Sequence, residues 1–258
     1  MTEKQPVWEG IYENFPEEVP DYVWNSDRWI NSLVKNLPAF LINQREDKGT
    51  ISPHSLVHEY PLPPVVALLG SIGSKKPLRV LDFGGGLGHL FLSCIRSLPE
   101  SFAIDFHIVE SARVCEKGRS IYSDFRNIHF HDQLPIKIET FDIIHVAAAL
   151  HYVRDWQMLL KNLSDYEPEI ILLSALNAGD VKTFVSFQNY YDTKIPVWFL
   201  NINDVFDCLK SLGYQLIYKS LLEFSFLGKF QSLPMRNFPK PYRLERKCNL
   251  MFAKEQKR

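Results

Sequence analysis

The segment Arg79–Phe91, with the sequence RVLDFGGGLGHLF, constrains the fold more than any other part of the chain. A short apolar run ends at Asp82, and glycines follow at the alternate positions 84, 86 and 88. Apolar residues then recur with helical spacing from Leu87 to Leu98. The pattern predicts a strand, a glycine turn and a helix. Because glycine tolerates positive φ and a helix N-terminus presents free N–H groups, we expect a ligand at this turn.

The spacing of the glycines separates two kinds of ligand site. Dinucleotide sites favour GxGxxG, with an acidic residue about twenty positions later. Here the pattern is DxGxGxG, which resembles motif I of class I S-adenosylmethionine (SAM) methyltransferases. The resemblance implies SAM as cofactor, held at Gly84, Gly86 and Gly88. The Asp82 carboxylate suits the charged α-amino group of SAM, directly or through water. A purely structural glycine turn and a true dinucleotide site are the alternatives.

Composition and charge are those of an ordinary globular protein. The 258 residues suffice for one α/β domain with an extra segment, or for two small domains. A net charge of −1 implies no broad cationic surface, which argues against nucleic acid as a partner. The four scattered cysteines indicate reduced thiols, and we recognise neither a secretory signal nor a membrane-spanning segment. We therefore expect a cytoplasmic protein, and the sequence leaves its oligomeric state open.

The pattern of the chain changes near residue 78. Residues 1–77 are rich in aromatic side chains and predict a helical N-terminal extension or lid. Within it, Ser26 is placed to cap a helix that ends before Pro38. From residue 78 strands and helices alternate, which predicts an α/β fold with a doubly wound, seven-stranded, mainly parallel sheet. We assign residues 78–258 to this domain, with substrate insertions near 177–201 and 227–243.

Two acidic residues end the second and third predicted strands. Ligands of such sheets lie at the carboxyl ends of the strands. Glu110, which ends FHIVE, has two carboxylate oxygens that suit the paired hydroxyls of a ribose. Asp132, which ends HFHD, is placed to contact the adenine amino group. The alternatives are an acid that complements the next helix dipole for Glu110, and a turn-forming residue for Asp132.

The fourth strand and the loop after it form a second informative block. The segment FDIIHVAAALHYVRDW, residues 141–156, resembles a block found in many small-molecule SAM methyltransferases. The resemblance implies that Ala147 lines the methionine part of SAM. His151 then faces the acceptor, where an imidazole with a pKa of about 6.5 can remove a proton from a hydroxyl. His151 is therefore the candidate general base, and a packed structural histidine is the alternative.

Two missing patterns narrow the reaction. No [N/D]-P-P-[Y/F] motif follows the fourth strand, which disfavours methylation of an exocyclic base or amide nitrogen. No cluster of Asp and Asn follows the fourth or fifth strand, so a magnesium-dependent mechanism has no support. We therefore expect no metal site.

The insertions are the candidates for binding the acceptor. Residues 177–201 are long for a strand-to-helix connection and rich in aromatic and amide side chains, Tyr190 among them, which suits a sugar-like ligand. A lid that packs on itself is the alternative. Residues 227–243 contain four basic residues that suit a phosphate on the substrate, although a solvated basic loop explains them as well.

The chain also resembles a narrower group, a bacterial family of methyltransferases associated with surface-polysaccharide biosynthesis. The resemblance rests on WEGIY near the start, on DFGGGLG, on FVSFQ after the fifth strand, and on WFLN. It implies methylation of a small-molecule or glycan-precursor acceptor, and it makes Gln188 the best candidate substrate residue. Tyr190, from the aromatic first insertion, is the second candidate. A non-catalytic SAM-fold protein and a methyltransferase for a non-sugar metabolite are the alternative functions.

Overall fold

We describe the fold from a computed structural model of the chain. The described residues are 6–17, 23–46, 60–72, 77–98, 102–136, 140–190, 193–222, 224–226 and 229–255. Within these residues no helix has both the length and the apolar character needed to cross a membrane.

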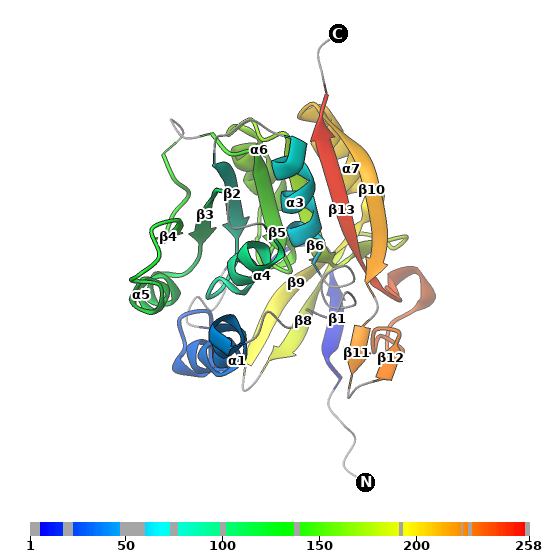
Figure 1. Ribbon diagram of the computed structural model, residues 1–258. Coiled ribbons are helices and arrows are strands. Elements are labelled where there is room, and N and C mark those ends of the chain that lie inside the picture. The colour runs from blue at the N-terminus through cyan, green and yellow to red at the C-terminus, as the bar shows by residue number, and fades with distance from the viewer. Residues whose placement is uncertain are drawn as a thin grey trace.

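The core of the molecule is one seven-stranded sheet (Figure 1). The sheet is parallel except for β13, which runs antiparallel to both of its neighbours. The prediction of a seven-stranded, mainly parallel sheet is therefore confirmed. Its strands, from one edge to the other, are β10 (Tyr214–Leu222), β13 (Lys247–Lys254), β6 (Ile170–Leu176), β5 (Ile143–Ala147), β2 (Leu78–Phe83), β3 (Ile104–Val109) and β4 (Ile128–His131).

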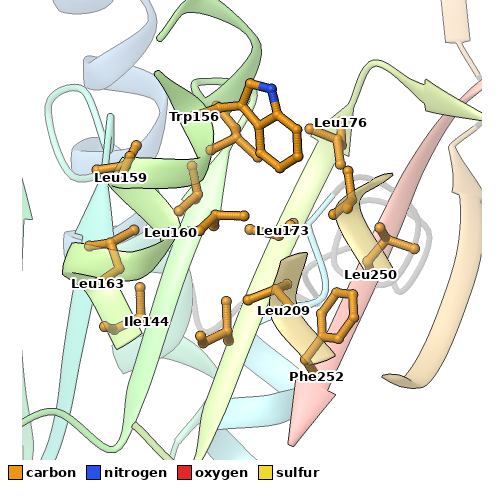
Figure 2. Close-up of a cluster of buried hydrophobic side chains, with 14 of the residues drawn as sticks. Ile144, Trp156, Leu159, Leu160, Leu163, Leu173, Leu176, Leu209, Leu250 and Phe252 are labelled. Carbon is orange, nitrogen blue, oxygen red and sulfur yellow. The ribbon is translucent and has the colours of Figure 1, made fainter. Parts of the chain in front are cut away.

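Helices cover both faces of this sheet, as Figure 1 shows. On one face α3 (Leu62–Ile72), α4 (His89–Ser97) and α5 (Ala112–Ile121) bury residues such as Val66, Phe91 and Val114. On the other face α6 (Trp156–Ser164) and α7 (Ile202–Ser211) pack on the central strands. Figure 2 shows Trp156, Leu160 and Leu209 against β5, β6 and β13. Alternate residues of each strand face the two layers, which explains the continuous apolar runs in the sequence.

The N-terminal extension contains helices and one strand. Helix α1 (Asp27–Glu46) begins where expected, because the Ser26 hydroxyl accepts a hydrogen bond from the Trp29 N–H at 3.2 Å. The prediction that this helix ends before Pro38 is wrong, since α1 continues to Glu46. A proline removes one hydrogen bond from a helix, and here that loss does not end it. Strand β1 (Trp8–Tyr12) was not anticipated in this extension.

A second sheet joins this extension to the first insertion. Residues 177–201 form β7 (Ala178–Gly179) and a hairpin of β8 (Phe184–Tyr190) and β9 (Thr193–Asn201), where a connecting loop was expected. Strand β1 pairs antiparallel with β8, and Trp8 lies opposite Gln188. The order of the sheet is β1-β8-β9-β7. The two segments that the sequence suggested as lid and substrate insertion are therefore one structural unit.

The second insertion packs beneath this small sheet. It contains β12 (Lys229–Gln231), which pairs with β11 (Phe224–Phe226) just before the insertion, and a 3-10 helix at Lys240–Tyr242. Its apolar residues Leu233, Met235 and Phe238 are buried against Phe184 and Phe199. The guanidinium of Arg243 donates to the carbonyl oxygens of Phe238 and Arg236. This basic side chain therefore stabilises its own turn.

Candidate functional site

A cavity of about 1080 Å³ opens at the carboxyl ends of β2, β3, β4 and β5. This is the position where ligands of open α/β sheets bind. Both the sheet and the N-terminal extension contribute to its wall. Its lining residues are Phe15, Trp24, Trp29, Leu33, Tyr60, Pro63, Phe83–Gly86, His89, Leu90, Ser93, Arg96, Val109–Ser111, Asp132–Leu134, Ala147–Ala149, Tyr152–Arg154 and Tyr190.

The glycine turn forms the floor of the cavity. Gly84 has φ +74° and Gly86 has φ +57°, both in the left-handed region that favours glycine. A Cβ on Gly84 would lie only 2.5 Å from the Cβ of Ala149. Gly88 does not line the cavity; it precedes α4, and a Cβ there would meet Ile108 and Ile128 at 3.2 and 3.1 Å. Gly84 and Gly86 therefore shape the site, and Gly88 permits close packing of α4 on the sheet.

Glu110 lies at the centre of the predicted cofactor side. It follows β3 directly and lines the cavity next to Gly86. One of its carboxylate oxygens, Oε2, accepts a hydrogen bond from the Ser111 N–H at 2.7 Å. Burial raises the pKa of Glu110, although backbone hydrogen bonds from Ser111 and Gly86 oppose the shift. A carboxylate held in this way is ready to accept further hydrogen bonds from a ligand.

Asp132 and Ala147 also line the cavity, on either side of Glu110 in the order of the sheet. Asp132 follows β4 at the sheet edge, and Ala147 is the last residue of β5. Ala148, the next residue, has φ +50°, which turns the chain sharply after the strand. The structure thus brings together Gly84, Gly86 and these three predicted contacts around one cavity.

Asp82 lies one layer below the cavity and does not line it. Its side chain is fully buried, and its Oδ1 accepts a hydrogen bond from His145 Nδ1 at 2.8 Å. The second imidazole nitrogen, Nε2, lies 2.8 Å from the hydroxyl of Ser174. The other carboxylate oxygen, Oδ2, has no hydrogen-bond partner among the described residues and lies beneath Gly85. The predicted contact of Asp82 with an amino group stays a prediction.

His151, the predicted general base, is buried behind the cavity wall. It belongs to a 3-10 turn, Leu150–Tyr152, and only 1% of its surface is exposed. Neither ring nitrogen has a hydrogen-bond partner among the described residues. Burial, together with the charge of Lys247, holds the pKa of His151 well below its ordinary value, so the imidazole is neutral near pH 7. It does not line the cavity, and its ring packs against that of Tyr152.

Four aromatic rings, those of Trp24, Trp29, Tyr152 and Tyr190, form an aromatic wall of the cavity. Trp24 lies 5.3 Å from Trp29, 5.0 Å from Tyr152 and 5.9 Å from Tyr190, between ring centroids. The predicted substrate residue Tyr190 is thus part of the lining. Gln188 is not, but its Oε1 accepts a hydrogen bond from the Tyr152 hydroxyl at 2.8 Å. Gln188 therefore does not reach the cavity itself but holds the hydroxyl of Tyr152, which lines it.

Several lining residues were not identified from the sequence. Arg96 and Arg154 bring two cationic groups to the cavity, and His89 lies at the start of α4 with its pKa lowered by burial. Tyr152 was missed although it follows His151 directly. The signal for Tyr152 was its place in the turn after β5, where one residue of the turn faces the ligand and its neighbour faces the core.

Comparison with known proteins bears on this arrangement. The model of a family described as a methyltransferase domain matches residues 56–219. That span contains the glycine turn, Glu110, Asp132 and the turn after β5. No curated protein gives a significant sequence match to the chain.

Solved structures share the fold at low sequence identity. A magnesium protoporphyrin IX methyltransferase from Synechocystis with bound SAM has a TM-score of 0.55 at 12% identity; the match covers 93% of this chain and 100% of that one. A 1,6-didemethyltoxoflavin N1-methyltransferase from Burkholderia thailandensis has a TM-score of 0.52 at 11% identity, over 95% and 100% of the two chains. A SAM-dependent methyltransferase from Clostridium acetobutylicum has a TM-score of 0.51 at 12% identity, over 88% and 99%.

Proposed function

Because the chain belongs to the methyltransferase domain family and takes SAM as its cofactor, we propose that it methylates a hydroxyl of a small-molecule or glycan-precursor acceptor. The observation that carries the proposal is the set of residues that line the cavity. The glycine turn and Glu110 line it together with an aromatic wall and two arginines. An enzyme that brings two small molecules together needs one cavity with contacts for both.

The residues of the cofactor side fit SAM. Gly84 and Gly86 leave room for a ligand against the backbone, where a side chain would occupy space. Glu110 offers a carboxylate to two ribose hydroxyls, and Asp132 lies where an adenine amino group is expected. When bound, SAM supplies an activated methyl group on positively charged sulfur. The main task of the protein is then to align the acceptor with that methyl group and to exclude water.

The aromatic wall supports a sugar-like acceptor. The faces of Trp24, Trp29 and Tyr190 can pack on the apolar face of a sugar ring. Arg96 and Arg154 can pair with the phosphates of a nucleotide-linked precursor. A place in surface-polysaccharide biosynthesis rests on the sequence resemblance alone, and we retain it as part of the proposal.

We propose His151 as the general base, with Tyr152 between it and the acceptor. The neutral imidazole that burial produces is the form that accepts a proton. Its ring packs against that of Tyr152, the neighbouring residue, which lines the cavity. His151→Ala is expected to lower turnover strongly with little change in SAM affinity, and unchanged turnover would remove His151 from this role.

Calorimetry with SAM and S-adenosylhomocysteine tests the cofactor side directly. We expect binding in the wild type, loss of binding in Gly86→Arg, and weaker binding in Glu110→Ala. Binding should also weaken as the pH falls through the raised pKa of Glu110, because ribose hydroxyls donate better to the charged carboxylate. Glu110→Gln should remove that pH dependence. Tight NAD binding with no heat from SAM would overturn the assignment.

A second candidate acceptor is a planar aromatic metabolite. The same four rings, Trp24, Trp29, Tyr152 and Tyr190, favour it because they can stack on a flat ring system. Release of S-adenosylhomocysteine can be followed with nucleoside-diphosphate sugars and with simple phenols. Activity that depends on Arg154 supports the phosphate-bearing sugar. Activity with phenols that survives Arg154→Gln supports the aromatic metabolite.

A further inference from the structure

A cluster of three histidines and one carboxylate lies on the edge of the main sheet, apart from the cavity lining. Asp105 and His107 are alternate residues of β3, and His129 and His131 are alternate residues of β4. The two strands pair in parallel with His107 opposite His129, so all four side chains project from one face. We name this group the edge cluster.

The atoms of the edge cluster converge as metal ligands do. Asp105 Oδ1 lies 2.8 Å from His129 Nε2, and Asp105 Oδ2 lies 3.2 Å from His107 Nε2. One ligand atom from each of the three residues lies within 4.8 Å of the others. A tetrahedral zinc ion with bonds of about 2.0–2.1 Å needs ligand atoms roughly 3.3 Å apart. The observed separations require only small side-chain adjustments to reach that geometry.

His131 supports one of these ligands from behind. Its Nε2 lies 3.0 Å from His107 Nδ1, and the two rings are stacked nearly parallel. If His107 Nδ1 donates this hydrogen bond, its Nε2 presents a lone pair toward the Asp105 carboxylate. That lone pair is then available to a metal ion. Metal-binding histidines are oriented by just such a bond at the other ring nitrogen.

The cluster is partly open to solvent, at Asp105 and His129, whereas His107 is buried. The opposite side chains of these strands, Phe106, Ile108 and Phe130, are buried under α4 and α5. The connection from β4 to β5 contributes no helix among its described residues, 132–136 and 140–142. The His129 side chain is 41% exposed and Asp105 27% exposed. A metal ion therefore has a path to the site.

We propose that Asp105, His107 and His129 bind one zinc ion, with His131 orienting His107. Two imidazole nitrogens and one carboxylate oxygen are a ligand set of zinc and related transition metals, and an unsuitable one for magnesium or calcium. Arg79 Nε lies 3.3 Å from Asp105 Oδ2, so the metal takes Oδ1. Zinc takes the place of the proton between Asp105 and His129, and that proton is released to solvent. The metal ion also fixes β4, the edge strand, which no described helix covers on this face.

Metal titration of the tag-free chain after dialysis against EDTA tests the proposal without reference to activity. Zinc chloride in a calorimeter should bind at one equivalent, and Co²⁺ should give the visible absorption of tetrahedral cobalt. His129→Gln, an exposed and structurally tolerant change, should weaken zinc binding more than about 100-fold. His131→Leu should weaken it about 10- to 100-fold, as loss of a supporting partner does.

Asp124→Asn is the matched control, because Asp124 is an exposed carboxylate on the turn before β4 that is outside the cluster. It should leave zinc affinity unchanged. Zinc binding that is absent in the wild type, or equal in His129→Gln and Asp124→Asn, would overturn the proposal. Circular dichroism of each variant confirms that it is folded. SAM binding and zinc binding are measured separately, so failure of one assignment leaves the other standing.

Discussion

The main sheet contains two networks built from the same residue types, one on each face, and they have opposite environments. Asp82, His145 and Ser174 join the three central strands β2, β5 and β6 and are sealed from solvent. The edge cluster joins β3 and β4 and is partly exposed. A buried network is costly to disturb because each polar atom depends on its partner. An exposed one can exchange its partners for water or a metal ion. Position in the sheet, rather than chemistry, decides which role an Asp–His pair takes.

The largest expected effect comes from breaking the central network. His145→Ala leaves the Asp82 carboxylate buried without its imidazole partner and should lower the free energy of unfolding by about 3–5 kcal/mol. Urea denaturation followed by circular dichroism measures this. A loss below about 1 kcal/mol would contradict the view that this network supports the glycine turn from below.

A smaller loss is expected at the other end of the same network. Ser174→Ala leaves the buried His145 Nε2 without its hydroxyl partner and should cost about 1–3 kcal/mol. Ser164→Ala is the control, since that exposed hydroxyl bonds only to the carbonyl of Lys161 and its loss should stay within about 0.5 kcal/mol. Equal effects of the two substitutions in urea denaturation would remove the distinction between buried and exposed sites.

The edge cluster should be visible as a modest pH dependence. Burial alone would raise the pKa of Asp105, but hydrogen bonding and charge from His107, with further contributions from His129 and Arg79, bring it below its ordinary value. A lowered carboxylate pKa stabilises the fold above the pKa of the unfolded chain, and this is lost as the pH falls through the folded value. The stability difference between wild type and Asp105→Asn should therefore shrink on acidification, as urea denaturation at several pH values will show. A stability difference that stays constant across these pH values would contradict the prediction.

The smallest effect is expected at the most exposed member of the edge cluster. Without metal, His129→Gln should change the free energy of unfolding by no more than about 0.5 kcal/mol, because an exposed ion pair contributes little. With zinc added, wild type should gain thermal stability and the variant should not. A large loss of stability in the variant without metal, seen in the same thermal melts, would show that His129 is as important for the fold as the buried residues of the central network.

The sequence predicts the fold well because its strongest signals are local. The strand–glycine–helix segment and the alternation after residue 78 each depend on residues close together in the chain. The small sheet was missed because strand pairing depends on distant partners. Strand β1 is short, contains Gly10, and finds its partner β8 more than 170 residues later. No local pattern identifies such a partner.

The site was predicted in part, and the difference is one of side-chain direction. Residues placed directly after strands, such as Glu110 and Asp132, line the cavity as expected. Asp82 lies within β2, and its side chain projects into the face of the sheet that α3, α4 and α5 cover. His151 and Tyr152 are neighbours in one turn, and only Tyr152 lines the cavity. The proposed metal site was not expected, because the sequence analysis looked for metal ligands after the fourth and fifth strands, and Asp105, His107 and His129 lie within the second and third predicted strands.

The pairing of β1 with β8 has a consequence for the order of folding. The glycine turn and its supporting strands lie within one stretch of chain, so they can assemble from comparatively near contacts. The wall formed by Trp24, Trp29 and Tyr190 must wait until residues 184–190 are available for the start of the chain to join. Closing a loop of this length is slow compared with local contacts. During synthesis, the cofactor half of the pocket should therefore mature before the half that receives the second reactant.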